Sequence, residues 1–435
     1  MNQTCQVGAA ETLQFGKNYS NPILDKKSGR AFWTVFGGFA LDAIDIQIYA
    51  FALPVLLSVW HLSHAEAGLL ATATLVSSAF GGWIAGLLAD RFGRVRIMKL
   101  TILWFAVATC LCGLAGNIEQ LFIARILQGL GFGGELAVGA VFIGEMAPAL
   151  FRGRMVGFAQ SGWAVGWGIA AAASLLLLSL LPQEQGWRVI FFIGLIPAVL
   201  VFIFRSRLAE SNTFKKSQHS TRWNTIFTKP FLGSTIKGSL LATGMHGGYW
   251  AIATWWPAML LSERGLSLVS SGPYLAALII GSFFGYAAGA CLGDLVGRRA
   301  TLLCFAISGI ALTLTYSQLP VSNAPFLLLS FPLGFVATGM FGIISSILVE
   351  LFPTELRGSG LGFCYNLGRG IAGLAPALIG GSAASLGVGN AIAMFVAIAY
   401  GLVLITTVFL LETRGTELKN LSEARRGLAV GSALG

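Results

Sequence analysis

Twelve apolar segments of helical length run along the chain, separated by short polar breaks or by breaks that contain glycine and proline. A helix needs about 20 apolar residues to cross a bilayer, so each segment predicts one transmembrane helix. The predicted spans are residues 31–58, 65–89, 97–116, 119–145, 155–181, 187–205, 235–261, 270–293, 300–318, 325–351, 359–384 and 388–411. Since barrel strands need only about 10 residues, we expect an all-α membrane protein.

A basic stretch near residues 206–234 divides these spans into two sets of six. The expected parts are an N-terminal tail (1–30), a first six-helix bundle (31–206), a central loop (207–234), a second bundle (235–411) and a C-terminal tail (412–435). The tail at 1–30 is polar and lacks the apolar core and cleavage site of a signal peptide. Lys and Arg gather in alternate connections, which predicts that both termini are cytoplasmic.

Composition agrees with this interpretation, because 55% of the 435 residues are hydrophobic and only 11% are charged. Soluble domains carry about 25% charged residues. The net charge of +10 sits beside membrane segments, which favours topology over nucleic-acid binding. No metal-ligand cluster, phosphate-binding loop or nucleophile constellation is recognisable. We therefore expect neither an enzyme nor a bound metal or cofactor. A membrane sensor is also not expected, because no appended soluble domain is recognisable.

The two halves repeat each other in sequence. An acid, a glycine and an arginine recur at an offset of 204 residues, and an acid and an arginine recur at an offset of 205. The first set is Asp90, Gly93 and Arg94, repeated as Asp294, Gly297 and Arg298; the second is Glu145 and Arg152, repeated as Glu350 and Arg357. A duplicated unit with an even number of helices keeps its orientation. The pseudo-two-fold axis is then along the membrane normal, with the binding site between the halves near mid-depth.

An aspartate pair lies inside the first span. Asp42 and Asp45 are spaced i, i+3, and Tyr49 continues the same face at i+7. A charge at mid-membrane costs about 2.5–3.5 kcal/mol even on the mildest scale. Such acids predict a proton-carrying or substrate-gating site, and the alternative is a structural pair that holds helices together.

Arg125 is expected at the same depth as Asp45 in a core of about 30 Å, counting 1.5 Å per residue. If the two meet, Arg125 favours the ionised carboxylate and protonation releases the contact, which makes a proton switch. A permanent structural bridge is the alternative. Glu135, deep in the fourth span, is either part of this relay or a helix-packing acid.

Arg369 is an arginine at mid-depth in the eleventh span, with Tyr365 and Asn366 before it. Its planar guanidinium can hold a substrate carboxylate in bidentate fashion, or it can pair with an internal acid. The offset of 204 makes His246 and Tyr249 equivalent to the aspartate pair, although a lone histidine can also be satisfied locally. Gln160 and Trp163 are expected to line the same cavity.

Residues 86–94, GLLADRFGR, match the signature of the major facilitator superfamily, and residues 293–299, GDLVGRR, resemble its second copy with Leu295 in place of Arg91. Residues 125–129, RILQG, resemble the fourth-helix motif. The repeated acids and arginines at 145, 152, 350 and 357 resemble the inner-face pairs of the sugar-porter-like branch. These groups, with Arg91, predict a latch that opens and closes with the transport cycle.

The segment Leu41–Asp45 resembles the first-helix acid motif of aromatic-acid:proton and related carboxylate:proton symporters, with Ala43 closer to lactate- and sialate-type variants. Residues 368–370, GRG, with Pro376, resemble the same group's eleventh helix. The resemblance implies a monomeric transporter in a bacterial inner membrane that imports a small organic anion with protons. A sugar or polyol symporter is the main alternative, and drug efflux is the third.

Overall fold

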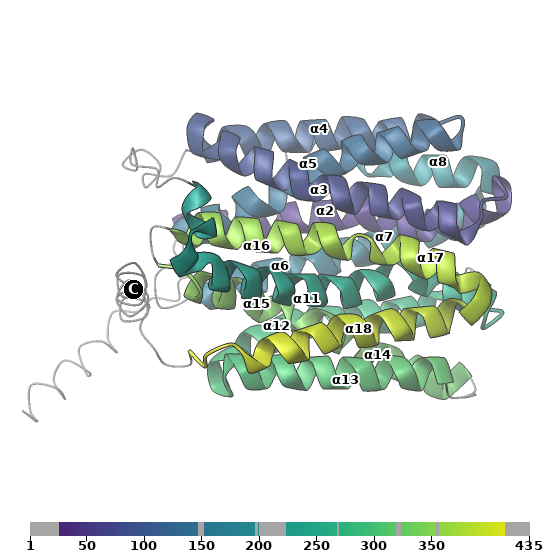
Figure 1. The fold of residues 1–435 in the computed structure, drawn as a ribbon. Coiled ribbons are helices and arrows are strands. Elements are labelled where there is room, and N and C mark those ends of the chain that lie inside the picture. Colours follow the sequence, from purple (N-terminus) through teal and green to yellow (C-terminus); the bar gives the residue numbers. More distant parts are fainter. Residues whose placement is uncertain are drawn as a thin grey trace, which may run out of the picture.

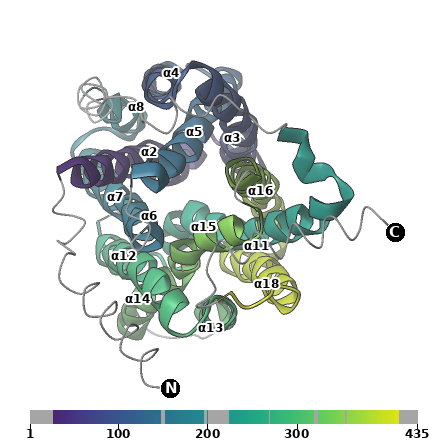
Figure 2. The ribbon, with the colours of Figure 1, turned by 90° about the vertical axis from the view of Figure 1, so that its left-hand side faces the viewer.

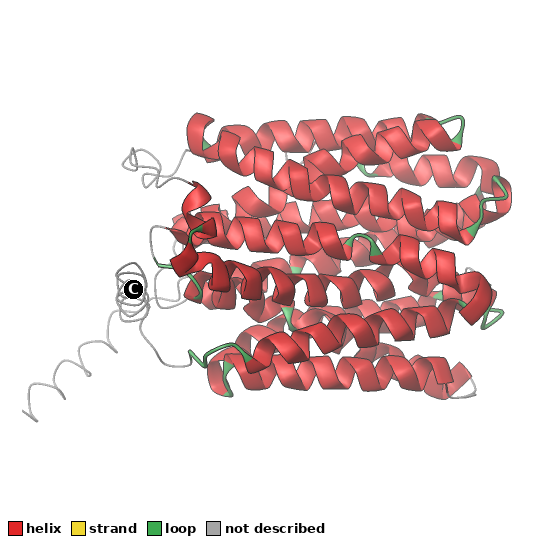
Figure 3. Cartoon of the chain, viewed as in Figure 1, coloured by secondary structure: helices red, strands yellow, loops and turns green. Residues whose placement is uncertain are grey.

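The computed structural model describes residues 26–146, 152–195, 199, 223–267, 269–318, 323–353 and 356–413. Within these ranges the chain is helical with short connections and contains no strand (Figure 3). The proposed tails at 1–25 and 414–435 and most of the central loop lie outside the described residues. The same holds for the side chains of Asp90, Arg94, Glu135, Glu145 and Arg152.

The twelve predicted spans correspond to helices or broken helices in the described ranges. The first half contains α2 (Lys26–Val59), α3 (His64–Phe92), α4 (Arg94–Leu114), α5 (Ile118–Met146), α6 (Arg152–Gln160), α7 (Gly162–Leu180) and α8 (Gln183–Ile193). The second half contains η1 (Trp223–Phe227), α11 (Lys229–Ser262), α12 (Gly272–Leu295), α13 (Arg298–Gln318), α14 (Asn323–Gly339), α15 (Phe341–Glu350), α16 (Arg357–Ala372), α17 (Ala375–Leu386) and α18 (Val388–Val408). Eight of the described spans are long and apolar enough to cross a membrane by length and composition alone.

Three spans are broken near their middle. The fifth is divided at Ser161 into α6 and α7, the tenth at Met340 into α14 and α15, and the eleventh between α16 and α17. Gly373 and Leu374 lie in the last break, and Pro376 follows in the first turn of α17, where its missing N–H is tolerated. Ser161, Met340 and Gly373 are buried at these breaks, whereas the Leu374 side chain is exposed. Where a break is buried, protein rather than lipid can satisfy the freed backbone groups.

The helix pairs of one half recur in the other. Helix α3 packs on α5 as α12 packs on α14, and α2 packs on α8 as α11 packs on α18. The view along the helices shows the two groups side by side (Figure 2), and both ends of the described chain lie at the left in Figure 1. We call this left-hand end, where α2 begins and α18 ends, the basic end. The predicted fold, two six-helix bundles related by duplication, is confirmed.

Glycines let the paired helices approach closely. A Cβ added at Gly81 of α3 would overlap the Leu130 backbone of α5, and one at Gly285 of α12 would overlap the Phe335 backbone of α14. Small residues at helix contacts replace the hydrophobic drive that is absent between helices in lipid. The equivalent glycines in the two halves therefore set the same helix spacing twice.

The duplicated motif makes the same turn in both halves. Gly93 (φ 102°) and Gly297 (φ 118°) have positive φ, which a glycine adopts without the strain of a side chain. Between the bundles, α3 contacts α16 and α17, α7 contacts α12, and α2 contacts α11. This arrangement leaves the middle of α2, α6, α7, α11, α12, α15 and α16 around a common centre.

Candidate functional site

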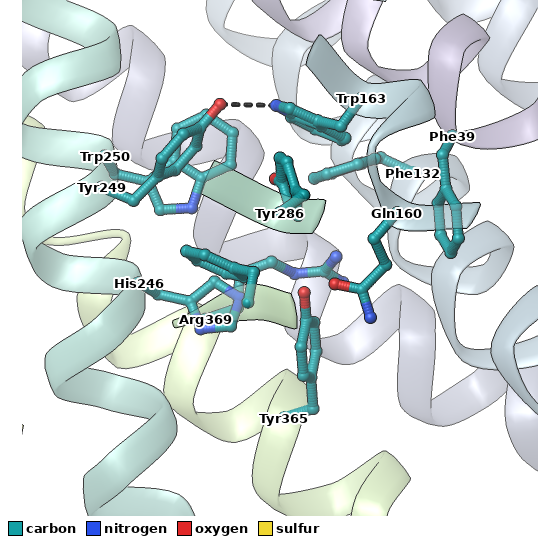
Figure 4. Close-up of a pocket in the computed structure, with 11 residues that line it drawn as sticks. Phe39, Phe132, Gln160, Trp163, His246, Tyr249, Trp250, Tyr286, Tyr365 and Arg369 are labelled. Carbon is teal, nitrogen blue, oxygen red and sulfur yellow. Dashed lines mark hydrogen bonds between the residues drawn. The ribbon is translucent and has the colours of Figure 1, made fainter. Parts of the chain in front are cut away.

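A cavity lies between the two bundles at the level of the helix breaks (Figure 4). The space between its side chains, together with the part open to solvent, amounts to about 380 Å³. The residues that line it are mostly aromatic: Phe39, Phe132, Gln160, Trp163, His246, Tyr249, Trp250, Tyr286, Phe341, Tyr365 and Arg369. All of them are buried, and we refer to this conformation as the closed state.

Arg369 is the one permanently charged side chain among the described residues that line the cavity. It projects from α16 and is only 1% exposed. Its Nη2 donates to the Ser78 carbonyl on α3 (3.2 Å) and to Asn366 Oδ1 (2.7 Å), and its Cζ lies 4.6 Å from the centre of the Phe132 ring. Its Nε and Nη1 have no hydrogen-bond partner. A buried cation with two unused donors is prepared to bind an anion.

Two hydrogen bonds join the bundles on either side of the cavity. Trp163 Nε1 donates to the Tyr249 hydroxyl (2.5 Å), and Gln160 Nε2 donates to Ser345 Oγ (3.1 Å). Gln160 and Trp163 flank the break at Ser161, with Gln160 about 4.5 Å nearer the basic end at 1.5 Å per residue. One inter-bundle hydrogen bond therefore lies on each side of the break at Ser161, with the Gln160 bond nearer the basic end.

His246 lies against the cavity on α11. Its Nδ1 is 2.8 Å from the Ala242 carbonyl, and since a carbonyl only accepts, Nδ1 carries a hydrogen. In a neutral ring Nε2 is then an acceptor. The imidazole packs edge-on against Phe341 and Tyr365, with ring centres 5.0 and 4.6 Å away. It can therefore contact a bound molecule from an aromatic wall.

The aspartate pair is fully buried but does not line the cavity. Asp42 lies within electrostatic range of Arg369, at the contact between the bundles. Asp45 points instead into the first bundle, where a Cβ at Gly194 after α8 would overlap its Oδ1. The two acids share a helix but not a neighbourhood, which differs from the single polar stripe that their spacing suggested.

The predicted contact between Asp45 and Arg125 is absent. Arg125 Nη1 donates to Gln128 Oε1 (2.7 Å), its Nε donates to the Leu70 carbonyl (3.4 Å), and its Cζ lies 4.2 Å from the Tyr49 ring centre. Both groups lie within the first bundle. Their directions around the helix axes differ, and Gln128 takes the place of the carboxylate.

Two residues predicted to bind substrate have structural partners instead. The Tyr49 hydroxyl donates to the Ala67 carbonyl of α3 (2.5 Å), which holds its ring beneath Arg125. Asn366 orients Arg369 and packs against Gly82, so it supports the cavity without lining it. The other predicted residues, from Gln160 to Arg369, do lie at the cavity.

At the basic end, the second copy of the predicted latch is assembled. Arg298 pairs with Asp294 (2.9 Å) and with Glu350 (3.3 Å), and Thr413 donates to Glu350. Arg357 is half-buried at the start of α16, and Arg91 is exposed with its Cζ 5.4 Å from the Phe92 ring. The side chains of the other first-copy acids and arginines lie outside the described residues.

Sequence reasoning missed Phe39, Phe132, Trp250, Tyr286 and Phe341 as cavity residues. A phenol such as Tyr286 in the middle of an apolar helix was the available signal, since its hydroxyl needs a polar neighbour. The phenylalanines gave no such signal, because the sequence does not distinguish a ring that faces lipid from one that faces a cavity. Among the described residues, no group of His, Cys, Asp and Glu is arranged to hold a metal ion.

Comparisons with known proteins agree with this geometry. Residues 35–376 match the family model of the Major Facilitator Superfamily. The chain is 39% identical to a probable 4-methylmuconolactone transporter of Cupriavidus pinatubonensis, with 91% of this chain and 93% of that protein covered. It is 31% identical to the cis,cis-muconate transport protein of Acinetobacter baylyi, with 82% and 89% covered.

The fold is similar to that of the solved xylose transporter XylE from E. coli in an inward open conformation. The TM-score is 0.71 at 20% identity, and the match covers 90% of this chain and 98% of that one. Family model, relatives and fold all point to one conclusion. The chain belongs to the major facilitator superfamily of membrane transport proteins.

Proposed function

We propose that this protein imports a small organic anion, an aromatic acid or another small carboxylate, together with protons by alternating access. The observation that carries the proposal is Arg369, buried in an aromatic cavity with Nε and Nη1 unpartnered. A carboxylate accepts two parallel hydrogen bonds from one guanidinium. Nothing in this role requires enzymatic chemistry.

The aromatic lining of the cavity favours a substrate that has a flat or unsaturated carbon skeleton beside its carboxylate. Trp163, Tyr249 and Phe341 offer ring faces and edges within one small space. Aromatic pairs contribute about 0.5–1.5 kcal/mol each beyond the area they bury. Relatives named for 4-methylmuconolactone and cis,cis-muconate transport support the same class of substrate.

Protons are the coupling ions in this proposal, and the first bundle supplies their sites. Asp42 and Asp45 carry them, Arg125 controls their ionised forms, and Glu135 takes part in the relay. Buried acids within membrane spans usually mark such a path. Both termini lie in the cytoplasm of a bacterial cell, and one chain is the working unit.

A sugar or polyol symporter is the second candidate, because the basic-end cluster of Arg298 and Glu350 and the XylE-like fold suit it. A neutral sugar needs a balanced set of donors and acceptors around many hydroxyls. The cavity does contain tyrosine hydroxyls and the Gln160 amide, but it also contains the fixed cation Arg369, and a buried cation favours an anion.

The test is uptake into proteoliposomes against a panel of radiolabelled organic acids and sugars, with and without an inward proton gradient. We expect one or more acids to accumulate only with the gradient, while sugars stay at the level of empty liposomes. Asp45→Asn should retain exchange across the membrane and lose accumulation. Sugar uptake with inert acids, or acid accumulation that ignores the gradient, would reject the proposal.

A further inference from the structure

Asp45 occupies a compartment of its own inside the first bundle. Its carboxyl lies against Gly194, where a Cβ would overlap Oδ1 and stand 3.3 Å from Thr109 Cγ2. The carboxyl is therefore enclosed by α2, α4 and the end of α8, and its exposure is 0%. The absence of a side chain at Gly194 leaves the space that the Asp45 carboxyl occupies.

Nothing in this compartment stabilises a negative charge. Neither oxygen of Asp45 has a hydrogen-bond partner among the described residues. The ionisable side chains nearby on α4 are Cys110 and Cys112, and α7 has none. Arg188 of α8 is bound to backbone carbonyls at the end of α4. Since an isolated buried carboxylate is very unfavourable, Asp45 is neutral in this closed state.

A hydrogen-bonded chain holds the nearest cation of α5 away from Asp45. Arg125 Nη1 donates to Gln128 Oε1 (2.7 Å), and Gln128 Nε2 donates to Thr109 Oγ1 (2.9 Å). We call these three residues the Gln128 bridge. Cys112 Sγ lies 4.0 Å from Gln128 Oε1 and within electrostatic range of both Arg125 and Asp45. The bridge therefore stands between the two groups.

Thr109 has two faces in this arrangement. Its hydroxyl accepts from Gln128 and donates to the Phe105 carbonyl (3.0 Å), and its methyl lies on the side of Gly194 and Asp45. The hydroxyl that could have reached the carboxyl is thus already engaged. The bridge therefore keeps the Thr109 hydroxyl from donating to Asp45.

We propose that Gln128, held by Thr109, keeps Arg125 from Asp45 in the closed transporter, so that Asp45 keeps its proton until this bridge opens. Gln128, Thr109 and Gly194 are positioning residues that act through Asp45. The inference deepens the proposed proton coupling and rests on it for its role in transport. It also distinguishes the two acids: Asp42 lies on the Arg369 side, and Asp45 holds its proton inside the first bundle.

The proposal is tested first on the purified protein in lipid nanodiscs, without substrate. Infrared spectra recorded over a pH series should contain a protonated-carboxyl band that shifts in D₂O. We expect Asp45→Asn to remove this band and Asp42→Asn to retain it. In Gln128→Leu and Thr109→Val, Arg125 is released toward Asp45, and the band should disappear at a pH about 1–3 units lower than in the wild type.

Matched variants separate this role from a loss of structure. Thr109→Ser keeps the hydroxyl and should restore the wild-type midpoint. Thr101→Val, in the same helix, loses a hydroxyl bonded only to backbone carbonyls (3.1 and 3.2 Å) and should leave the midpoint unchanged. The proposal is overturned if no Asp45-dependent band exists, or if Gln128→Leu titrates like the wild type.

Transport gives the second measurement. Gln128→Leu should lower the accumulation ratio of the imported acid toward one while exchange remains, because an ionised Asp45 cannot release a proton. Accumulation equal to that of the wild type would overturn the proposal. If the wild type accumulates no organic acid while the infrared band behaves as expected, the proposed function fails and the positioning role of Gln128 stands.

Discussion

Arg369→Gln is the substitution from which we expect the largest loss of substrate binding. The two unpartnered donors of Arg369, Nε and Nη1, are available to a carboxylate, and each hydrogen bond to a charged group contributes about 1.5–3 kcal/mol. Glutamine can replace one of them with a neutral donor, which leaves a net loss of about 2–4 kcal/mol. At 1.36 kcal/mol per factor of ten, binding weakens roughly 30- to 1,000-fold.

The Kd should be measured on purified protein by calorimetry, with the acid that gives the strongest uptake. Arg369→Lys keeps the charge but not the planar fork, so its loss should be intermediate. Arg264→Gln is the matched control, because Arg264 stacks 3.9 Å from the Phe326 ring centre and donates to the Tyr316 carbonyl, away from the cavity. A change in Kd below about threefold for Arg369→Gln would refute the assignment of the anion site.

Three further outcomes are expected. Trp163→Phe removes one inter-bundle hydrogen bond worth about 1 kcal/mol. It should therefore raise the rate at which a thiol reagent labels a cysteine introduced into the cavity about fivefold. Trp104→Phe is the control and should not raise this rate, because Trp104 Nε1 donates to a backbone carbonyl within the first bundle. Gly81→Val should lower the Tm because its side chain meets the α5 backbone, whereas Gly86→Val has open space and should not; equal Tm values would contradict the packing. Glu350→Gln should weaken the basic-end cluster and raise protease cleavage of the tail after Thr413, and unchanged cleavage would show that the cluster holds nothing.

The helical architecture could be predicted because membrane spans impose a length and a hydropathy that are visible in any one sequence. The duplication also predicted which positions of the two halves correspond, since an offset of 204 residues relates the two motif turns. Gly93 and Gly297 in these turns share the same unusual positive φ. The same offset places His246 and Tyr249 opposite the aspartate pair, and both line the cavity. Asp42 and Asp45 themselves do not line it, so the repeat preserves the fold without preserving which side chains face the cavity.

Contacts between side chains could not be predicted in the same way. Counting residues gives depth along the membrane, but a contact also requires direction around the helix axis. Asp45 and Arg125 are expected at one depth, yet Gln128, one turn along α5 from Arg125, binds the guanidinium instead. The three helix breaks had a similar effect, because the break at Ser161 redirects Gln160 and Trp163 toward separate partners on the other bundle.

The position of Arg369 gives a physical reason for coupling anion and proton. Arg369 belongs to the second bundle, but its guanidinium donates to Ser78 on the first and lies within electrostatic range of Asp42. A bound anion cancels the field of the guanidinium, so it makes protonation of a nearby carboxylate more favourable. By linkage, a bound proton makes anion binding more favourable to the same extent. One cation shared by both bundles can therefore favour loading with both ions together, which is what symport requires.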